Sequence, residues 1–214
     1  MTRPHRPLFA LALLLLGSAA LRDGWDAWVN RTVLPTTLTT TSVEMRDRDG
    51  VLMRAFAVED GRMRLVVVPG SVDPLLTDML IAYEDKRFMH HNGVDGRALL
   101  RAAVQAVTSG KVVSGGSTLT MQVARLLENS GTGSVRGKLR QMRLAWALER
   151  KLGKDEILNL YLQHAPYGGR IEGVRSATLT WFGKEPTRLS PAEAALLVAL
   201  PQSPEARRPD RAPE

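Results

Sequence analysis

The chain contains no cysteine and only four histidines among its 214 residues. The absence of cysteine excludes disulfide bonds, thiolate metal sites and lipid attachment through a cysteine side chain. Two of the histidines, His90 and His91, are adjacent, and no second histidine pair follows at the spacing of metal ligands, so the sequence predicts no metal site. A long apolar run is missing as well, because the stretch from Leu8 to Leu21 has only fourteen residues.

This N-terminal stretch would extend about 21 Å as a helix, less than the ~30 Å hydrocarbon core of a bilayer. Its length and the small residues Gly17 to Ala20 favour a cleaved signal peptide. Trp25 and Trp28 are typical of interfacial anchors, and the cations before the stretch would hold the N-terminus in the cytoplasm, which favours an uncleaved membrane helix. We expect residues 1–30 to be a membrane anchor with a short cytoplasmic end. Both interpretations export the remaining chain.

Composition and charge limit the number of domains and the class of partner that the remaining chain can have. With 44% apolar residues, the chain after this segment can form one domain with a hydrophobic core. The net charge of +7 and the isoelectric point near 10.2 favour an anionic partner: nucleic acid, phospholipid head groups or a phosphate-bearing substrate. Charge alone does not distinguish among them.

The sequence predicts a mainly α fold with a small N-terminal β-hairpin region. Asp-Gly pairs at Asp49 and Asp60, flanked by β-forming residues, predict two hairpins within residues 43–68. Apolar periodicity, N-caps and helix stops predict the helices downstream. The expected helices are 74–83, 96–107, 118–127, 138–152, 154–163 and one that opens at Pro191. Residues 129–137 are expected to form a loop, and the proline-rich residues 205–214 a frayed tail or the start of a linker.

Two short strings could carry chemistry. Glu84-Asp85 ends an apolar helix, where a partly desolvated carboxylate suits a general base. Gly115-Gly116-Ser117-Thr118 opens a helix, whose N-terminal N–H groups attract anions such as a diphosphate. Taken singly, a surface ion pair and an ordinary capped turn explain these strings better, so their weight comes from occurring together.

The predicted helix at residues 138–152 is strongly basic. Lys138 and Arg140 begin it, and Leu139, Met142 and Trp146 are expected to form its core-facing stripe. Its charged face would meet either an anion or solvent.

These strings resemble the motifs of the family 51 glycosyltransferases, the peptidoglycan polymerases that use lipid II. The resemblance runs from about Val43 to Arg211, and the arrangement is most similar to the penicillin-binding protein 1C branch. It predicts a lysozyme-like glycosyltransferase domain at residues 43–204. The strings that carry it are Glu84–Gly93, Gly115–Gln122, Lys138–Glu149, Lys154–Leu162, Ala165–Gly169 and Leu189–Pro204.

The resemblance implies a role for each matching residue. Glu84 would be the catalytic base in an inverting polymerisation of lipid II to β-1,4-linked glycan with release of undecaprenyl diphosphate. Catalytic support would come from Asp85, Phe88, His91 and Gln141. The sugar diphosphate would bind Gly115, Gly116, Ser117, Thr118, Gln122, Arg125, Lys138 and Arg140.

Gln141 departs from the family pattern, which has a glutamate at that position. An amide cannot ionise, so we expect Glu84 to be the sole base and Gln141 a neutral hydrogen-bonding group. We expect no required cofactor and less dependence on metal than in the rest of the family, with Mg²⁺ or Mn²⁺ as the candidate divalent cation.

Other functions compete with this hypothesis. A muramidase or lytic transglycosylase also places one glutamate on a helical scaffold but needs no diphosphate cradle. A nucleic-acid-binding module would use the basic helix without Glu84. The Ser-x-x-Lys and Lys-Thr-Gly strings of a transpeptidase are absent from these 214 residues. We therefore expect a glycosyltransferase that is monofunctional within these residues, either as a complete polymerase or as the front piece of a longer protein. We expect it to be single-pass in the bacterial inner membrane with its domain on the periplasmic side, and to bind lipid II, nascent glycan and membrane but no nucleic acid. An unspecified cell-wall synthesis complex is a further candidate partner.

Overall fold

The computed structural model describes residues 5–37, 39–109, 115–129 and 134–211. It divides into two units, Met1–Leu34 and Pro35–Glu214. The first unit consists of helix α1 (His5–Asn30), which includes 23 residues of mean hydropathy 1.4 from Leu8 to Asn30. The helix is longer than the apolar run because it continues through the polar turn at Arg22 and Asp23. A membrane anchor and a signal sequence both meet this description.

The second unit begins with a hairpin that confirms the first of the two predicted. Strand β1 (Val43–Arg46) pairs antiparallel with β2 (Leu52–Phe56). The Asp47 side chain accepts hydrogen bonds from the backbone N–H groups of Asp49 and Val51, which fixes the turn. The second predicted hairpin is wrong, because β3 (Met63–Arg64) pairs in parallel with the distant β4 (Ile171–Glu172) instead of with β2.

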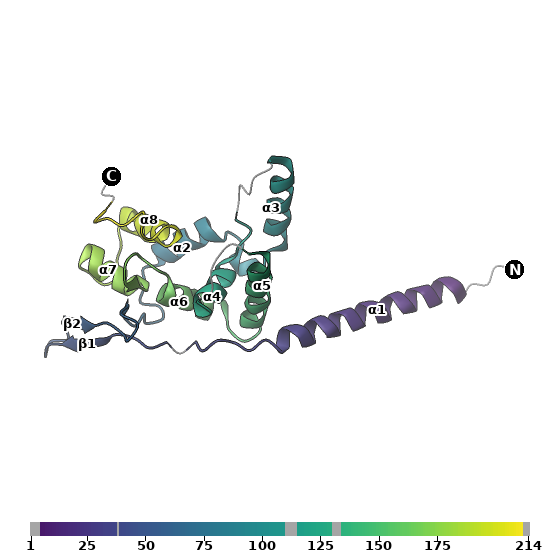
Figure 1. Cartoon of the computed structure of the whole chain (residues 1–214), viewed down its shortest axis with the longest axis horizontal. Coiled ribbons are helices and arrows are strands. Elements are labelled where there is room, and N and C mark those ends of the chain that lie inside the picture. The colour runs from purple at the N-terminus through teal and green to yellow at the C-terminus, as the bar shows by residue number, and fades with distance from the viewer. Residues whose placement is uncertain (1–4, 38, 110–114, 130–133, 212–214) are drawn as a thin grey trace. The chain divides into compact units, whose positions relative to one another are not determined.

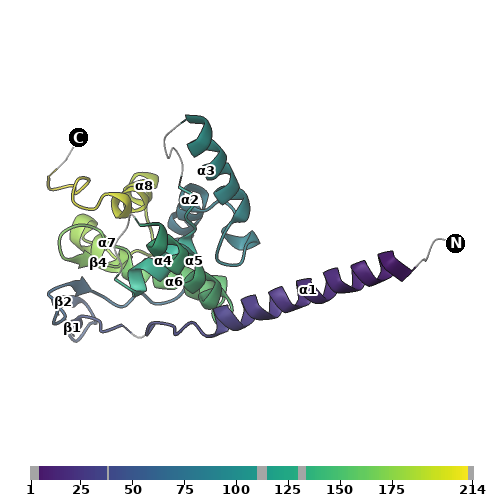
Figure 2. The same ribbon diagram turned by 45° about the vertical axis from the view of Figure 1, so that its right-hand side comes forward.

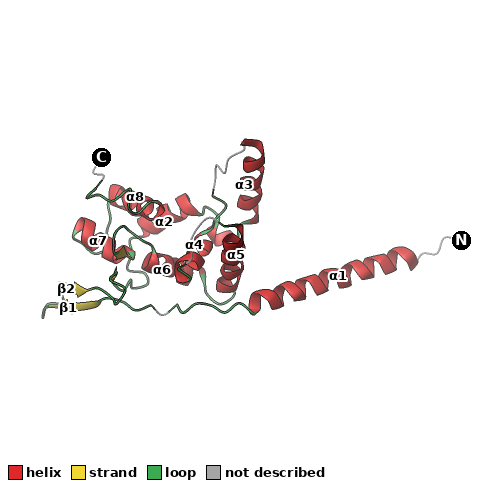
Figure 3. Cartoon of the chain, viewed as in Figure 1, coloured by secondary structure: helices red, strands yellow, loops and turns green. Residues whose placement is uncertain are grey.

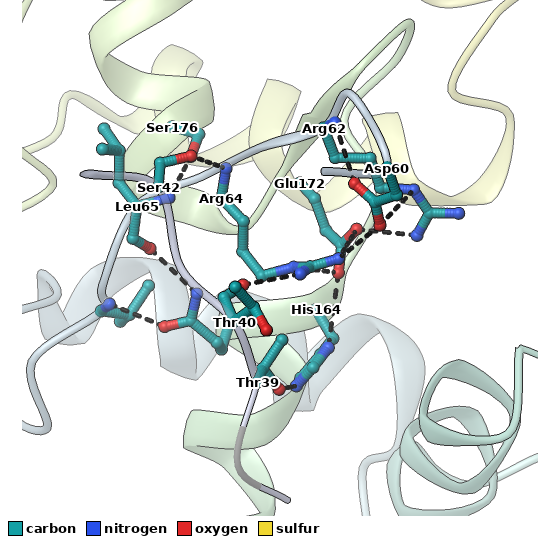
Figure 4. Close-up of polar contacts among 12 residues, drawn as sticks. Thr39, Thr40, Ser42, Asp60, Arg62, Arg64, Leu65, His164, Glu172 and Ser176 are labelled. Atoms are coloured by element: carbon teal, nitrogen blue, oxygen red, sulfur yellow. Dashed lines mark hydrogen bonds and ion pairs between the residues drawn. The ribbon is translucent and has the colours of Figure 1, made fainter. Parts of the chain in front are cut away.

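A buried ion-pair network explains this distant pairing (Figure 4). The Glu172 carboxylate accepts hydrogen bonds from the guanidinium groups of Arg62 and Arg64, each at 2.8 Å. On its other side lies His164, whose second ring nitrogen is 2.8 Å from the Thr39 hydroxyl. The network attaches the chain before β1 and the β3 strand to the end of α6, which no local turn preference could predict.

Helices are the main regular structure of the second unit (Figure 3). They are α2 (Pro74–Glu84), α3 (Gly96–Ser109), α4 (Leu119–Leu127), α5 (Val135–Glu149), α6 (Lys154–His164), α7 (Val174–Phe182) and α8 (Pro191–Ala199), with short 3₁₀ helices η1 (Phe88–His90) and η2 (Leu200–Gln202). Their ends follow sequence signals. Asp73 caps α2 ahead of Pro74, and Ser190 and Glu193 form the predicted capping box of α8.

The core forms where α4 packs on α5 and α6, and where α2 packs on α8 (Figures 1 and 2). Helix α3 has no buried residue. The largest fully buried side chains include Tyr161, Tyr167, Phe88, Leu76, Leu80, Leu119, Leu144, Leu148 and Leu197.

Helix α5 corrects the predicted face of the basic helix. It begins at Val135, capped by Ser134, so residues 135–137 are helical and not loop. Leu139 is 58% exposed, whereas the buried side includes Gln141, Leu144 and Leu148. The prediction of a Leu139, Met142 and Trp146 core stripe is wrong because it excluded the one polar residue, Gln141, that occupies a core position.

The segment after α8 is docked, whereas the sequence predicts fraying from residue 205. The backbone N–H of Gly169 donates to Glu205 at 2.6 Å, and the Arg207 guanidinium donates to the carbonyl of Ala199 at 2.8 Å. The described residues 203–211 therefore belong to the folded unit.

Candidate active site

Glu84 lies at the last position of α2, half-buried, and both of its carboxylate oxygens are hydrogen-bonded. Oε2 accepts from the amide of Gln122 on α4 at 2.9 Å. Oε1 accepts from the amide of Gln202 in η2 at 2.8 Å. Three elements distant in the sequence therefore hold one carboxylate in place. A carboxylate offers about four lone-pair positions, so two neutral donors leave room for a third hydrogen bond.

The adjacent Asp85 is buried and connects α2 to α4. Its carboxylate accepts from the His91 ring at 2.9 Å and from the backbone N–H of Leu119 at 3.0 Å. A carboxylate at the N-terminus of α4 also interacts favourably with the helix dipole.

The glycine-hydroxyl turn leads into α4 as predicted. Thr118 is the N-cap and accepts from the backbone N–H of Met121, and its hydroxyl donates to the carbonyl of Gly93 at 2.5 Å. The ammonium group of Lys138, on α5, contacts the Ser117 hydroxyl. The turn and the basic helix therefore meet.

The cations near this turn are not neutralised. In the described ranges, no carboxylate lies within ion-pair distance of Lys138 or Arg125. Burial, and then the positive charge of Arg125, lower the pKa of Lys138 below its usual value. Burial and the Arg125 charge both disfavour the charged form of Lys138, and an anion bound beside it would stabilise that form.

Arg125 also lines a cavity of about 390 Å³ between α4 and the β4 region. Arg62 and Arg170 contribute further positive charge to its lining. Because Arg62 also pairs with Glu172, the acidic residue in the lining is already neutralised. The cavity therefore presents a surplus of positive charge at the C-terminal end of α4.

Phe88 and His91 support the site from within the core. Phe88 is fully buried, and the ammonium of Lys154 lies 4.4 Å from its ring centroid. Lys154 also donates to the carbonyl of His91 and to Glu149, each at 2.6 Å. The loop after Asp85 is thus held by α6 and by the end of α5.

Some of the other predicted site residues are buried in the fold, and others are exposed on its surface. Gln141 is 6% exposed within α5, and the hydrogen bonds described for Glu84 and Asp85 go to other residues. Arg140 is exposed and pairs with Glu128 at 2.9 Å, so it is not brought to Ser117 as Lys138 is. Gly115 is exposed, whereas an added Cβ at Gly116 would lie 3.0 Å from the Leu99 side chain.

Sequence reasoning missed two residues near Glu84. Gln202 bonds it from 118 positions away, and an uncharged amide in a proline-rich string gives no catalytic signal. Tyr161 is 2% exposed, and burial, followed by the charges of Tyr167 and Glu84, raises its pKa well above the usual value. Its hydroxyl has no hydrogen-bond partner among the described residues. The only sequence signal for Tyr161 was its place in the Lys154–Leu162 string.

No group of three or more His, Cys, Asp or Glu side chains that could hold an ion occurs in the described ranges. The Asp85 carboxylate is engaged by His91 and by the backbone of Leu119, and Gln141 is a neutral amide at the position where the family resemblance implies a second carboxylate. This set of side chains does not fit a divalent cation, which prefers several carboxylate or carbonyl oxygens.

Comparison with known proteins identifies the family of this chain. A family model described as a transglycosylase matches residues 49–214. The chain is 48% identical over 167 residues to penicillin-binding protein 1C of Escherichia coli, covering 78% of this chain and 22% of that protein. It is 42% identical over 145 residues to penicillin-binding protein 1A of Neisseria gonorrhoeae, covering 68% of this chain and 18% of the relative. With penicillin-binding protein 1A of Pseudomonas aeruginosa the identity is 41% over 168 residues, 78% of this chain and 20% of the relative.

The chain therefore spans about a fifth of the length of these relatives. The family match covers most of its folded unit and all of the site described above. The chain belongs to the transglycosylase family, the family 51 glycosyltransferases, and stands close to the penicillin-binding protein 1C branch within it.

Proposed function

We propose that this domain polymerises lipid II by inverting glycosyl transfer, with Glu84 as the general base. The observation that carries the proposal is the meeting of three groups around α4. Glu84 bonds Gln122 within the helix, the Ser117-Thr118 turn opens it, and Lys138 reaches Ser117 from α5. A base, an anion-binding helix start and an unpaired cation are what transfer from a glycosyl diphosphate requires.

The reaction follows from these positions. Glu84 accepts the proton of the acceptor sugar's 4-hydroxyl as that oxygen attacks the anomeric carbon of the lipid-linked donor. The new β-1,4 bond forms on the face opposite the diphosphate, and the bond between the anomeric carbon and the diphosphate oxygen breaks. Lys138 and Arg125 stabilise the negative charge of the departing undecaprenyl diphosphate, aided by the N–H groups at the Ser117-Thr118 turn.

The N-terminal helix fits a lipid-linked substrate. We place α1 in the bacterial inner membrane as a single-pass anchor, with the N-terminal cations in the cytoplasm and the catalytic unit on the periplasmic side. Tethering and net positive charge would both concentrate the domain where a diphosphate-bearing lipid is presented.

Polymerisation of fluorescent lipid II by the purified full chain, resolved by glycan length, tests the function. Glu84→Gln should lower the rate by roughly 10²–10⁴-fold, the usual contribution of a general base. Glu59→Gln, which neutralises an exposed carboxylate between β2 and β3, is the matched control and should keep full activity. An active Glu84→Gln variant would refute the assignment of the base. Release of soluble muropeptides from cell-wall sacculi, without lipid II polymerisation, would identify a muramidase instead.

We propose that turnover needs no bound metal and that Gln141 acts as a neutral group of the site. Chelation should then leave the rate unchanged, while Gln141→Ala should lower it, because a cavity and a lost amide would disturb α5 beside Lys138. Collapse of activity on chelation, with Gln141→Ala fully active, would reject this part of the mechanism.

A further inference from the structure

The orientation of the Gln202 amide can be assigned from its partners. Arg207 donates from Nη1 to Gln202 Oε1 at 3.2 Å and to the carbonyl of Ala199 at 2.8 Å. A guanidinium can only donate, so the amide oxygen must face Arg207. The amide nitrogen is thereby directed at Glu84 Oε1, 2.8 Å away. Arg207 sets the direction in which Gln202 donates.

Arg207 is itself held by the docked segment, residues 203–208. Its backbone N–H donates to the carbonyl of Ser203 at 3.0 Å. One residue later, the Arg208 side chain lies against the glycine turn of the Ala165–Gly169 string. A Cβ added at Gly168 would lie 2.6 Å from Arg208 Cγ and 2.8 Å from the Pro204 carbonyl oxygen. Only glycine lets this segment approach so closely, and the Gly168 φ of +99° also favours glycine.

From this chain of contacts we propose that Arg207 and Gln202 form a positioning pair for the catalytic base. The docked segment 203–208 is then a functional part of the active site and not a tail. This inference rests on the proposed role of Glu84. The Gln122 and Gln202 amides each occupy one oxygen of the carboxylate, which fixes its plane and leaves a lone pair for the acceptor hydroxyl. Loss of the Gln202 donor would free the carboxylate to rotate away from the acceptor hydroxyl.

The first test reads the carboxylate without substrate. Side-chain carboxyl carbons of the ¹³C-glutamate-labelled full chain are recorded by NMR at one fixed neutral pH, and Glu84→Gln identifies the Glu84 signal. Gln202→Ala and Arg207→Ala should each shift the Glu84 signal, because each variant changes the hydrogen bond to its Oε1. Arg211→Ala removes an exposed cation just beyond the docked segment that pairs with Glu205 and not with Gln202, and it should leave the Glu84 signal in place. A Glu84 signal at its wild-type position in both Gln202→Ala and Arg207→Ala would overturn the proposal.

The second test uses lipid II polymerisation. In both variants kcat should fall about tenfold with little change in KM, because the base is misplaced while the diphosphate cradle is intact. Arg207→Lys, which keeps one donor, should recover part of kcat, whereas a purely structural role would give reduced thermal stability with an unmoved Glu84 signal. If the wild-type chain made no glycan but the Glu84 signal moved in both variants, the proposed function would fail while the positioning pair stood.

Discussion

The Asp85 carboxylate accepts a hydrogen bond from the backbone N–H of Leu119 at 3.0 Å, across 34 residues of sequence. The bond ties the end of the helix that carries Glu84 to the first turn of the helix that carries Gln122. Since Glu84 directly precedes Asp85, the position of the proposed base relative to α4 depends on this one buried carboxylate.

Asp85→Asn should therefore weaken both folding and activity. The asparagine oxygen can still accept from Leu119, but the charge opposite His91 is lost, and a buried hydrogen bond to a charged group contributes about 1.5–3 kcal/mol. We expect the free energy of unfolding in urea to fall by about that amount, and kcat to fall more than KM rises. Asp78→Asn, an exposed acid of the same helix, is the control and should change neither. Equal urea midpoints for the two variants would contradict the bridging role.

A second prediction concerns the close approach of the His91–Gly93 loop to α5. Gly93 has a φ of +87°, and an added Cβ would lie 2.6 Å from the carbonyl oxygen of Ala145. Gly93→Ala should lower the free energy of unfolding by more than about 2 kcal/mol, because backbone strain and a clash with a buried helix act together.

Gly96→Ala provides the contrast, because nothing lies within 4 Å of an added Cβ there. We expect its free energy of unfolding to stay within about 0.5 kcal/mol of the wild-type value. Thermal or urea unfolding of both variants measures the difference. A Gly93→Ala chain as stable as Gly96→Ala would show that the loop can move off α5 without cost.

Local sequence signals predicted much of the site. Asp73 and Pro74 open α2, an apolar stripe carries it to Glu84, and Thr118 caps α4 where the hydroxyl pair predicted it. Each depends on contacts within one or two turns. Such signals can be identified from the sequence because helix capping and apolar periodicity involve neighbouring residues.

The remaining contacts leave no such pattern. The bond from Gln202 to Glu84 and the ion pair between Arg64 and Glu172 join residues more than a hundred positions apart. Burial of Gln141 reversed the expected face of α5, since a polar residue at a core position breaks the apolar stripe. Tertiary packing, not propensity, decides these features.

The lowered pKa of Lys138 predicts a pH dependence. Burial and the charge of Arg125 both disfavour the ammonium, so the charge is lost at a lower pH than the usual 10.5. If the charge stabilises the leaving diphosphate, the wild-type rate should fall at an alkaline pH below 10.5, whereas Lys138→Arg stays charged and keeps its rate.

The Arg125→Gln variant separates the effect of burial on the Lys138 pKa from the effect of the Arg125 charge. Removing the neighbouring charge should move the alkaline limb to higher pH, even though the maximal rate falls because Arg125 is itself a proposed diphosphate contact. Initial rates of lipid II polymerisation across the alkaline pH range measure both effects. An alkaline limb that persists unchanged in Lys138→Arg would assign it to another group.

The Glu172 network predicts how stability depends on acid. Burial raises the pKa of Glu172, but the hydrogen bonds from His164, Arg64 and Arg62 outweigh it and lower the pKa to about 2, from 4.5. The carboxylate is thus held ionised, and its stabilising effect is complete above pH 4.5 and is lost as pH falls toward 2. Asp60, the other acid facing this cluster, pairs with Arg64 at 3.5 Å and is half-exposed, so it replaces little of the lost charge.

Glu172→Gln should therefore be less stable than wild type by about 3 kcal/mol at neutral pH, because it leaves Arg64 buried without its main partner. The difference in unfolding free energy should shrink steadily between pH 5 and pH 2, where wild-type Glu172 becomes neutral as well. Urea denaturation at closely spaced pH values measures it, with Glu59→Gln as the exposed control that should show no such convergence. A difference that stays constant down to pH 2 would mean that Glu172 contributes through shape and not through charge, and β3 would then be held to β4 by packing alone.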